Sequence, residues 1–252
     1  MILCEDTRIS RKLLAKHNIK TKLQIYNDHS DYQERKVIRI LIDNGAIVSL
    51  ISDAGTPLIS DPGYKLVRQL RELNYHVDVI PGVSALTTAI TISGLPSDRF
   101  LFAGFLPKTI EGKKKIFIEL ASVKATLIFF ETASRIEQSL HTALAVLGNR
   151  EVCVARELTK LHQEVKLGLI ENVINFYKQN IIKGEIVLLI SGTSEEANTA
   201  SLADDLKKFI HLYLSKGWSA RSITDMANEN FGRNYSKKEI YAVVNKIKNS
   251  SD

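Results

Sequence analysis

The stretch Ser52-Asp53-Ala54-Gly55-Thr56-Pro57-Leu58-Ile59-Ser60-Asp61-Pro62-Gly63 lies between two segments with different hydrophobic patterns. Residues 46–51 before it form a short apolar run that is typical of a buried strand, and residues 64–74 after it have apolar side chains at helical spacing. The stretch is therefore predicted to be the loop at the carboxyl end of a strand, where α/β proteins bind their ligands. A tight turn in which Asp61 caps the next helix explains the same residues without a ligand.

A second loop of the same kind follows along the chain. Residues 77–80 are predicted to be the next strand, and Pro81-Gly82-Val83-Ser84-Ala85 leads into an apolar helix over residues 83–93. Because the carboxyl ends of parallel strands meet at one edge of a sheet, we expect the two loops to converge on one crevice.

Apolar runs alternate with helical patterns over most of the chain, which predicts an α/β fold with helices covering parallel strands. From residue 201 onward no strand pattern remains, and we expect three helices there, with Ser219 and Ser236 as N-caps. An RNA-binding unit with helix-turn-helix-like spacing and a plain helical appendage explain this last part equally well. The predicted parts are an N-terminal α/β domain with a parallel sheet and a last strand at 100–105 (1–106), a linker with solvated lysines (107–115), a second α/β domain (116–195) and a helical extension (196–252).

Composition narrows the class of protein. The chain has 252 residues and only two cysteines, which excludes a disulfide framework and suits a reducing cytoplasm. No apolar run approaches the ~20 residues that span a membrane, and the first residues do not have the pattern of a signal peptide. The six histidines do not cluster, so we expect no metal site. The net charge of +6 is compatible with a polyanionic partner such as RNA.

Standard nucleotide-binding and hydrolase signatures are absent. The sequence contains no GxxxxGK[ST], which excludes a P-loop. It contains no GxGxxG after a strand either, so Gly55-Thr56-Pro57 is not a usual phosphate-binding loop. It also contains no strand-borne GxSxG, so a Ser-His-Asp hydrolase is not supported.

A set of motifs, in order and at fitting distances, matches one family. The motifs are Cys4-Glu5-Asp6-Thr7-Arg8, the loop at 52–63, Pro81-Gly82-Val83-Ser84-Ala85, the stretch 93–100 (SGLPSDRF), the stretch 155–162 (ARELTKLH) and Gly184-Glu185-Ile186-Val187. From Cys4 to about residue 192 the chain resembles the ribosomal RNA methyltransferases of the tetrapyrrole-methylase superfamily.

The resemblance implies a fold of two α/β domains of the tetrapyrrole-methylase type, with S-adenosylmethionine in the cleft between them. It also implies a homodimer that transfers the methyl group to the ribose 2′-hydroxyl of a cytidine in the decoding region of 16S ribosomal RNA. The positions that match the cofactor-binding motifs are Ala54, Gly55, Thr56, Ile59, Ser84, Ala85, Glu131, Leu158, Gly184, Glu185 and Ile186.

The reaction needs a group that removes the proton of the ribose hydroxyl, because this hydroxyl is otherwise a poor nucleophile. Glu5, Asp6 and Lys160 are candidates for this base or for orienting groups. Arg8 and Arg156 are able to grip a phosphate. We name Asp6, Arg8 and Lys160 first as catalytic residues, although Asp6 also fits as the cap of a helix at residues 9–17.

The chain departs from the family pattern at its start. Members begin with a strand and a Gly-containing loop before the Glu5–Arg8 element, and this strand and loop are missing here. We therefore expect either a mis-set start or a truncated protein with impaired folding and activity. Two other functions stay open: a small-molecule tetrapyrrole methylase, which shares the cofactor loops, and a non-catalytic RNA-binding remnant. The basic charge, the helical extension and the residues of the 52–63 loop argue against the first.

Overall fold

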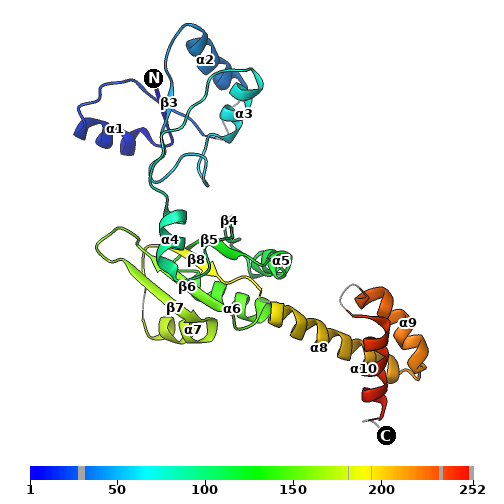
Figure 1. Ribbon diagram of the computed structural model, residues 1–252. Helices are drawn as coiled ribbons and strands as arrows, with labels where there is room; N and C mark the ends of the chain where they lie inside the picture. Colours follow the sequence, from blue (N-terminus) through cyan, green and yellow to red (C-terminus); the bar gives the residue numbers. More distant parts are fainter. Residues whose placement is uncertain (28–31, 181, 194, 233–234, 250–252) are drawn as a thin grey trace. The chain divides into compact units, whose positions relative to one another are not determined.

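The computed structural model describes residues 1–27, 32–180, 182–193, 195–232 and 235–249 (Figure 1). The chain divides into two compact units: Met1–Leu120 with Ala125–Ser191, and Ala121–Lys124 with Gly192–Asp252. Strands and helices alternate through the first unit, and the described part of the second unit is helical. The predicted α/β class is therefore confirmed.

A small parallel sheet begins the first unit. Its strands β1 (Ile2–Cys4), β2 (Leu23–Ile25) and β3 (Ser49–Leu50) are ordered β2-β1-β3, which confirms the predicted parallel pairing. The helices α1 (Thr7–Lys16), α2 (Tyr32–Asp43) and α3 (Tyr64–Glu72) connect or follow these strands. Their buried side chains form one core cluster of Leu3, Tyr26, Ile38, Leu66 and Leu70.

The prediction of a strand at residues 77–80 is wrong, and the strand expected at 46–51 is reduced to β3. A strand needs the hydrogen bonds of a neighbouring strand, and among the described residues the sheet ends at β3. Some apolar side chains of these segments face solvent, with Ile47 86% exposed and Ile80 87% exposed. Val48 and Val77, by contrast, pack partly buried against the core cluster.

The start of helix α3 also differs from the prediction. Its N-cap is Gly63, whose φ of 132° is open to glycine, and no side chain caps the helix. The prediction that Asp61 caps α3 is therefore wrong, and its carboxylate is left for other contacts. A side chain at position 63 has no room, because a Cβ there lies 2.5 Å from Leu50 Cδ2.

A larger mixed sheet follows. It has the order β4-β5-β8-β6-β7, in which only the β4–β5 pair is parallel. Because β4 pairs with β5, the prediction that residues 100–105 are the last strand of the first domain is wrong. The prediction of a linker with solvated lysines at 107–115 is also wrong, because helix α5 (Ile110–Leu120) begins inside this range and Lys113 is fully buried. The other domain boundaries stay predictions. The strands are β4 (Phe100–Phe105), β5 (Thr126–Thr132), β6 (Glu151–Arg156), β7 (Glu164–Leu169) and β8 (Glu185–Ile190).

Helices cover both faces of this sheet. On one face, Ala89 and Ile90 of α4 (Ala85–Ser93) pack in a core cluster with Ile128, Cys153 and Leu189. On the other face, Phe117 of α5 (Ile110–Leu120) meets Phe129 edge to face, because successive side chains of a strand point to opposite faces. The remaining helices are α6 (Ile136–Leu147) and α7 (Ile170–Gln179).

Three helices make up the described part of the second unit: α8 (Glu195–Leu214), α9 (Ala220–Phe231) and α10 (Lys237–Asn249). Their own core contains Leu206, Ile210, Ile223, Ala227, Ile240 and Val244. Ser219 accepts a hydrogen bond from the amide of Ser222, and Ser236 and Glu239 form a reciprocal capping pair, so both predicted N-caps are confirmed. In the ranges described above, no helix is both long and apolar enough to cross a bilayer.

Candidate cofactor and substrate site

The two loops predicted to converge are in contact. Thr56 Oγ1 donates a hydrogen bond of 2.9 Å to the carbonyl oxygen of Val83. Gly55 lies beside the same carbonyl: a Cβ added at position 55 would be 3.9 Å from the carbonyl oxygen of Val83. The first loop is held compact from within, since Ser52 Oγ donates to the carbonyl of Ala54 at 3.1 Å. Ile59, at the far side of this loop, is 40% exposed.

Helix α4 connects the second loop to the larger sheet. Ser84 is the N-cap of α4, and its carbonyl accepts bonds from the side chains of the next turn. Leu86, which follows Ala85, packs against the same core cluster as Leu158. The predicted positions 84, 85 and 158 are thus brought to one region of the first unit.

Three other predicted segments meet at one end of the larger sheet. Ile186, near the start of β8, pairs with Glu131 of β5 on one side and with Arg156 of β6 on the other. Gly184 and Glu185 come directly before this point. The side chain of Ile186 is buried, and its main chain lies between two neighbouring strands.

A loop with unusual backbone conformation follows β6. Glu157 and Thr159 both have left-handed φ angles, 48° and 65°, on either side of Leu158. Strained residues of this kind are concentrated at functional sites. Glu157 holds the loop to β8, because its Oε1 accepts from the amide of Glu185 at 2.9 Å and from Lys160 Nζ at 3.0 Å. Sequence reasoning missed Glu157, although its spacing to Lys160 was a usable signal.

Lys160 is held as a cation. Its Nζ lies 2.9 Å from Glu185 Oε2 and 3.0 Å from Glu157 Oε1. The hydrogen bonds to Glu185 and Glu157 raise the pKa of Lys160 above its ordinary value. A protonated ammonium does not accept a proton, so this arrangement favours the predicted role of orienting group over that of base.

Glu131 faces the helices and not an open cavity. Its carboxylate is buried and bonded to Arg135 at 2.6 Å and to Ser139 Oγ at 2.8 Å, with Lys113 Nζ 3.8 Å away. Burial lowers the pKa of Lys113. The carboxylate of Glu131 therefore holds α5 and α6 at the end of β5, and its main chain is the part that reaches the sheet end.

Asp6 and Arg8 form one unit at the start of α1. Asp6 is the N-cap, accepting from the amide of Arg8 at 2.8 Å, and it also binds the Arg8 guanidinium at 2.6 Å. The bond to Arg8 lowers the pKa of Asp6 to about 2. A carboxylate of such low pKa is a poor base. The Arg8 side chain is largely exposed, and among the described residues its ion pair is with Asp6.

Glu5 lies in a group of acids. Burial raises the pKa of Glu5, and repulsion by Asp61, Asp53 and Asp6 adds to the rise. Burial also raises the pKa of Asp61. The hydrogen bond to Ser52 lowers this pKa in part, and repulsion by Asp53 raises it further. The end of β1 and the 52–63 loop therefore share a negative field. Asp53 and Asp61 were not predicted as site residues, although both lie in the loop at residues 52–63.

Arg156 is committed to the protein. Its guanidinium lies 3.6 Å from Glu164 and donates to the carbonyl of Lys183 at 3.2 Å. Of the two arginines predicted to grip phosphate, Arg8 is the one that faces solvent.

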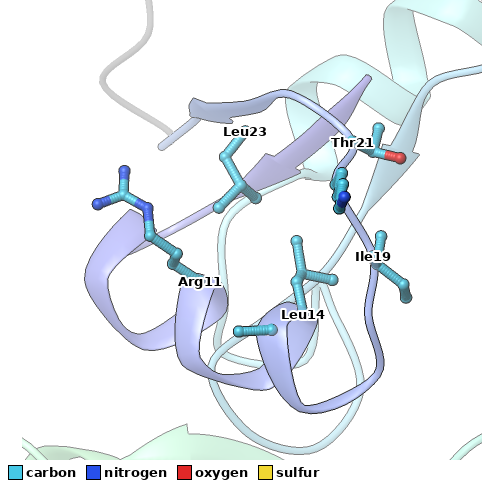
Figure 2. A pocket seen from close by; sticks show the side chains of 7 residues that line it. Arg11, Leu14, Ile19, Thr21 and Leu23 are labelled. Carbon is cyan, nitrogen blue, oxygen red and sulfur yellow. The ribbon is translucent and has the colours of Figure 1, made fainter.

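A separate hollow lies beside α1. Figure 2 shows Arg11, Leu14, Ile19, Thr21 and Leu23 around it, with Ala15 and Lys20 completing the lining. None of these residues is a predicted site residue. The hollow therefore belongs to the packing of α1 against the loop that leads into β2.

Comparison with known proteins identifies the family. Residues 1–174 match the family of Tetrapyrrole (Corrin/Porphyrin) Methylases, and the chain belongs to this family. The chain is 64% identical to Ribosomal RNA small subunit methyltransferase I of Rickettsia prowazekii, over 98% of this chain and 88% of that protein. It is 40% identical to the protein of the same name from Thermotoga maritima, over 76% of this chain and 86% of that protein.

Solved structures show the same fold at low sequence identity. Diphthine synthase matches with a TM-score of 0.52 and 11% identity, over 78% of this chain and 81% of that chain. Uroporphyrin-III-C-methyltransferase from Thermus thermophilus matches with a TM-score of 0.50 and 16% identity, over 75% of this chain and 81% of that chain. These similarities support the tetrapyrrole-methylase type of fold. The assignments of individual site residues stay predictions.

Proposed function

We propose that this chain transfers a methyl group from S-adenosylmethionine to the ribose 2′-hydroxyl of a cytidine in the decoding region of 16S ribosomal RNA. The coarser function, methylation of small-subunit ribosomal RNA, is carried by the 64% identity to a ribosomal RNA small subunit methyltransferase I over 98% of the chain. The assignment to the ribose 2′-hydroxyl and to a cytidine is more specific, and it rests on the motif resemblance.

The loops fit the methyl donor. When bound, S-adenosylmethionine supplies a methyl group activated by a sulfonium and leaves as S-adenosylhomocysteine. Ala54, Gly55 and Thr56 present main chain and small side chains beside the Val83 carbonyl, which leaves space for a large ligand to approach the backbone. On the larger sheet, the main chain at Gly184 to Ile186 and the side chain of Leu158 are the corresponding wall.

The proton of the ribose hydroxyl passes to Glu5 in this proposal. Its raised pKa makes it a stronger proton acceptor than Asp6, whose pKa Arg8 lowers to about 2. With the donor bound, the deprotonated oxygen would be directed at the methyl carbon, whose bond to sulfur would break as the new bond forms. The exposed Arg8 binds a phosphate next to the target ribose, and Lys160 fixes the loop after β6 through Glu157 and Glu185.

The partners follow from the same proposal. The substrate is 16S ribosomal RNA or the small ribosomal subunit, which locates the reaction in the cytoplasm. We also expect a homodimer. The exposed apolar side chains Ile47, Val79, Ile80 and Val83 support a contact with another chain. Light scattering of the purified chain measures the mass in solution, and a monomer at all concentrations contradicts the dimer.

The reaction is tested with S-adenosylmethionine carrying a deuterated methyl group and unmethylated small ribosomal subunits. We expect the label on the ribose of a cytidine after digestion of the RNA to nucleosides and mass spectrometry. A label on a base contradicts the ribose assignment. Label on a tetrapyrrole offered in parallel, and none on RNA, contradicts the RNA substrate.

The role of Glu5 has its own test. Replacing the acceptor in Glu5→Gln should lower kcat by a factor on the order of 10² to 10⁴, with the Kd of S-adenosylmethionine unchanged. Asp6→Asn is the matched control, since it removes a neighbouring carboxylate of low pKa. If Asp6→Asn loses more of kcat than Glu5→Gln does, Glu5 is not the base.

A further inference from the structure

The last part of the helical unit has an excess of basic residues, although Gly192–Asp252 as a whole contains nine Lys and Arg against eight Asp and Glu. Residues 206–249 contain nine Lys and Arg against three Asp and Glu, an excess of six that equals the net charge of +6 of the whole chain. The other residues therefore balance to zero. A basic segment of this kind produces a local field that attracts a polyanion.

The helices of this segment bury their apolar faces against one another. Leu206 and Ile210 of α8 pack with residues of α9 and α10 in a cluster of their own. The only tryptophan of the chain, Trp218, nevertheless stays 45% exposed at the connection between α8 and α9. The exposed part of the Trp218 ring is therefore accessible to a ligand.

The surroundings of Trp218 hold its ring in place. Its amide donates to the carbonyl of Tyr213 at 3.1 Å, and the two rings meet edge to face with centroids 5.3 Å apart. Lys216 Nζ lies 5.3 Å from the centroid of the Tyr213 ring. Gly217 makes the turn between them with a φ of +77°, which favours glycine. Arg221, also exposed, follows in the first turn of α9.

We propose that this group of residues, Tyr213, Lys216, Trp218 and Arg221 (the Trp218 corner), binds single-stranded RNA. One base stacks on the exposed face of Trp218, and Lys216 and Arg221 contact the flanking phosphates. Aromatic rings next to basic side chains are how proteins hold unpaired nucleotides without reading a sequence. The proposal deepens the proposed function and rests on it, because it assigns part of the RNA contact to the helical unit.

Two of the three acids in residues 206–249 have partners of their own within the unit. Asp225, the acid nearest to Arg221 in the sequence, is paired with Lys237 at 2.6 Å. Glu239 is engaged with Ser236 at the start of α10. A membrane surface is the other polyanion to consider, but an interfacial helix needs a broad apolar face, and the apolar faces of α9 and α10 are buried in their own core.

Trp218 allows a direct measurement, since it is the only tryptophan. The full chain is titrated with an unstructured oligouridine while the tryptophan fluorescence is recorded. We expect quenching that saturates, because a stacked base changes the environment of the indole. Binding of the oligouridine, measured by the anisotropy of a label on the RNA, without any change of tryptophan fluorescence overturns the proposal.

Variants separate stacking from charge. By anisotropy, Trp218→Ala should weaken RNA binding by about tenfold, and Trp218→Phe should restore most of it. The double variant Lys216→Glu/Arg221→Glu should also lower the slope of log Kd against log salt by about 1.4, since each phosphate contact contributes about 0.7 on single strands. Lys178→Glu on α7 is the control for the reversal of a single charge away from the Trp218 corner. It should leave the Kd for RNA nearly unchanged. Equal weakening by Lys178→Glu means a general effect of charge and contradicts a specific corner.

Two further measurements test binding to a membrane surface and the proposed function separately. Vesicles containing phosphatidylglycerol that quench Trp218 more strongly than RNA does overturn the choice of RNA. Methylation of small subunits by Trp218→Ala at the wild-type rate under limiting substrate overturns the proposal and leaves the proposed function intact. RNA-dependent quenching in a chain that methylates no RNA overturns the proposed function and leaves the corner as an RNA-binding surface.

Discussion

The two sheets of the first unit differ in how firmly their strands are held. The three-stranded sheet consists of strands of two or three residues, whereas each strand of the five-stranded sheet has six or seven. β1 is paired over two or three residues on each side, while β6 is paired over six residues with β7 and five with β8. The number of ladder hydrogen bonds and the buried area therefore both favour the larger sheet.

This difference has a functional meaning. The Glu5–Arg8 element and the 52–63 loop stand on the smaller sheet, and the chain around residues 79–83 is exposed beside them. Binding loops commonly belong to the parts of a protein with the lowest local stability. We therefore expect the larger sheet to determine the global stability of the unit and the smaller sheet to open locally.

The largest effect is expected from Phe129→Ala in β5. Phe129 is fully buried and meets Phe117 edge to face, so its removal leaves a cavity and should lower the free energy of unfolding by about 3–5 kcal/mol. Ile80→Ala on the exposed segment should change it by less than about 0.5 kcal/mol. Urea unfolding followed by circular dichroism measures both. Equal losses contradict the difference between the regions.

A pH effect of intermediate size is expected from Cys153 in β6. Burial raises the pKa of its thiol to about 11. The unfolded thiol loses its proton near pH 8.5, so stability is fully present below that pH and falls as the pH rises toward about 11, by about 2–3 kcal/mol. The difference in unfolding free energy between the wild type and Cys153→Ala, recorded from about pH 8 to pH 11, isolates this part. A difference that does not change with pH shows that the thiol is not shielded from water.

The comparison also explains which parts of the structure the sequence predicts. The apolar runs at 125–130, 151–155 and 185–190 predict strands there, and they match β5, β6 and β8 nearly to their ends. The pattern is clear because helices cover both faces of this sheet. The strand at 77–80 is wrong, because a local apolar pattern does not show whether a neighbouring strand is present to pair with it. The two loops do meet at Thr56 and Val83, but the predicted reason is wrong, because residues 77–80, directly before the second loop, form no strand. The ion pairs that hold Lys160 and Glu131 depend on tertiary contacts within the chain, and these contacts cannot be inferred from one sequence.

A smaller effect is expected from Gly184→Ala at the sheet end. Gly184 has a φ of +101°, and a Cβ there lies 2.5 Å from Glu157 Cδ, so the carboxylate that holds Glu185 and Lys160 must move. We expect a loss of about 1–2 kcal/mol in stability and weaker S-adenosylmethionine binding by calorimetry. Gly148→Ala is the control: it shares a positive φ of +78° but has nothing within 4 Å. If both variants bind the donor equally well, the contact with Glu157 does not shape the site.

Each sheet contains one buried free cysteine, Cys4 in β1 and Cys153 in β6, and these thiols report local opening directly. In the single-cysteine variants Cys153→Ala and Cys4→Ala, we expect an alkylating reagent at about pH 8 to label Cys4 at least about tenfold faster than Cys153, which corresponds to about 1.4 kcal/mol of opening free energy. The reagent reacts with the opened form, in which both thiols are in water, so the raised pKa of Cys153 in the folded state does not produce the difference. In urea the two should react at similar rates. If Cys153 is labelled as fast as Cys4 under native conditions, the two sheets open as one cooperative unit, and the smaller sheet is not the weaker support of the site.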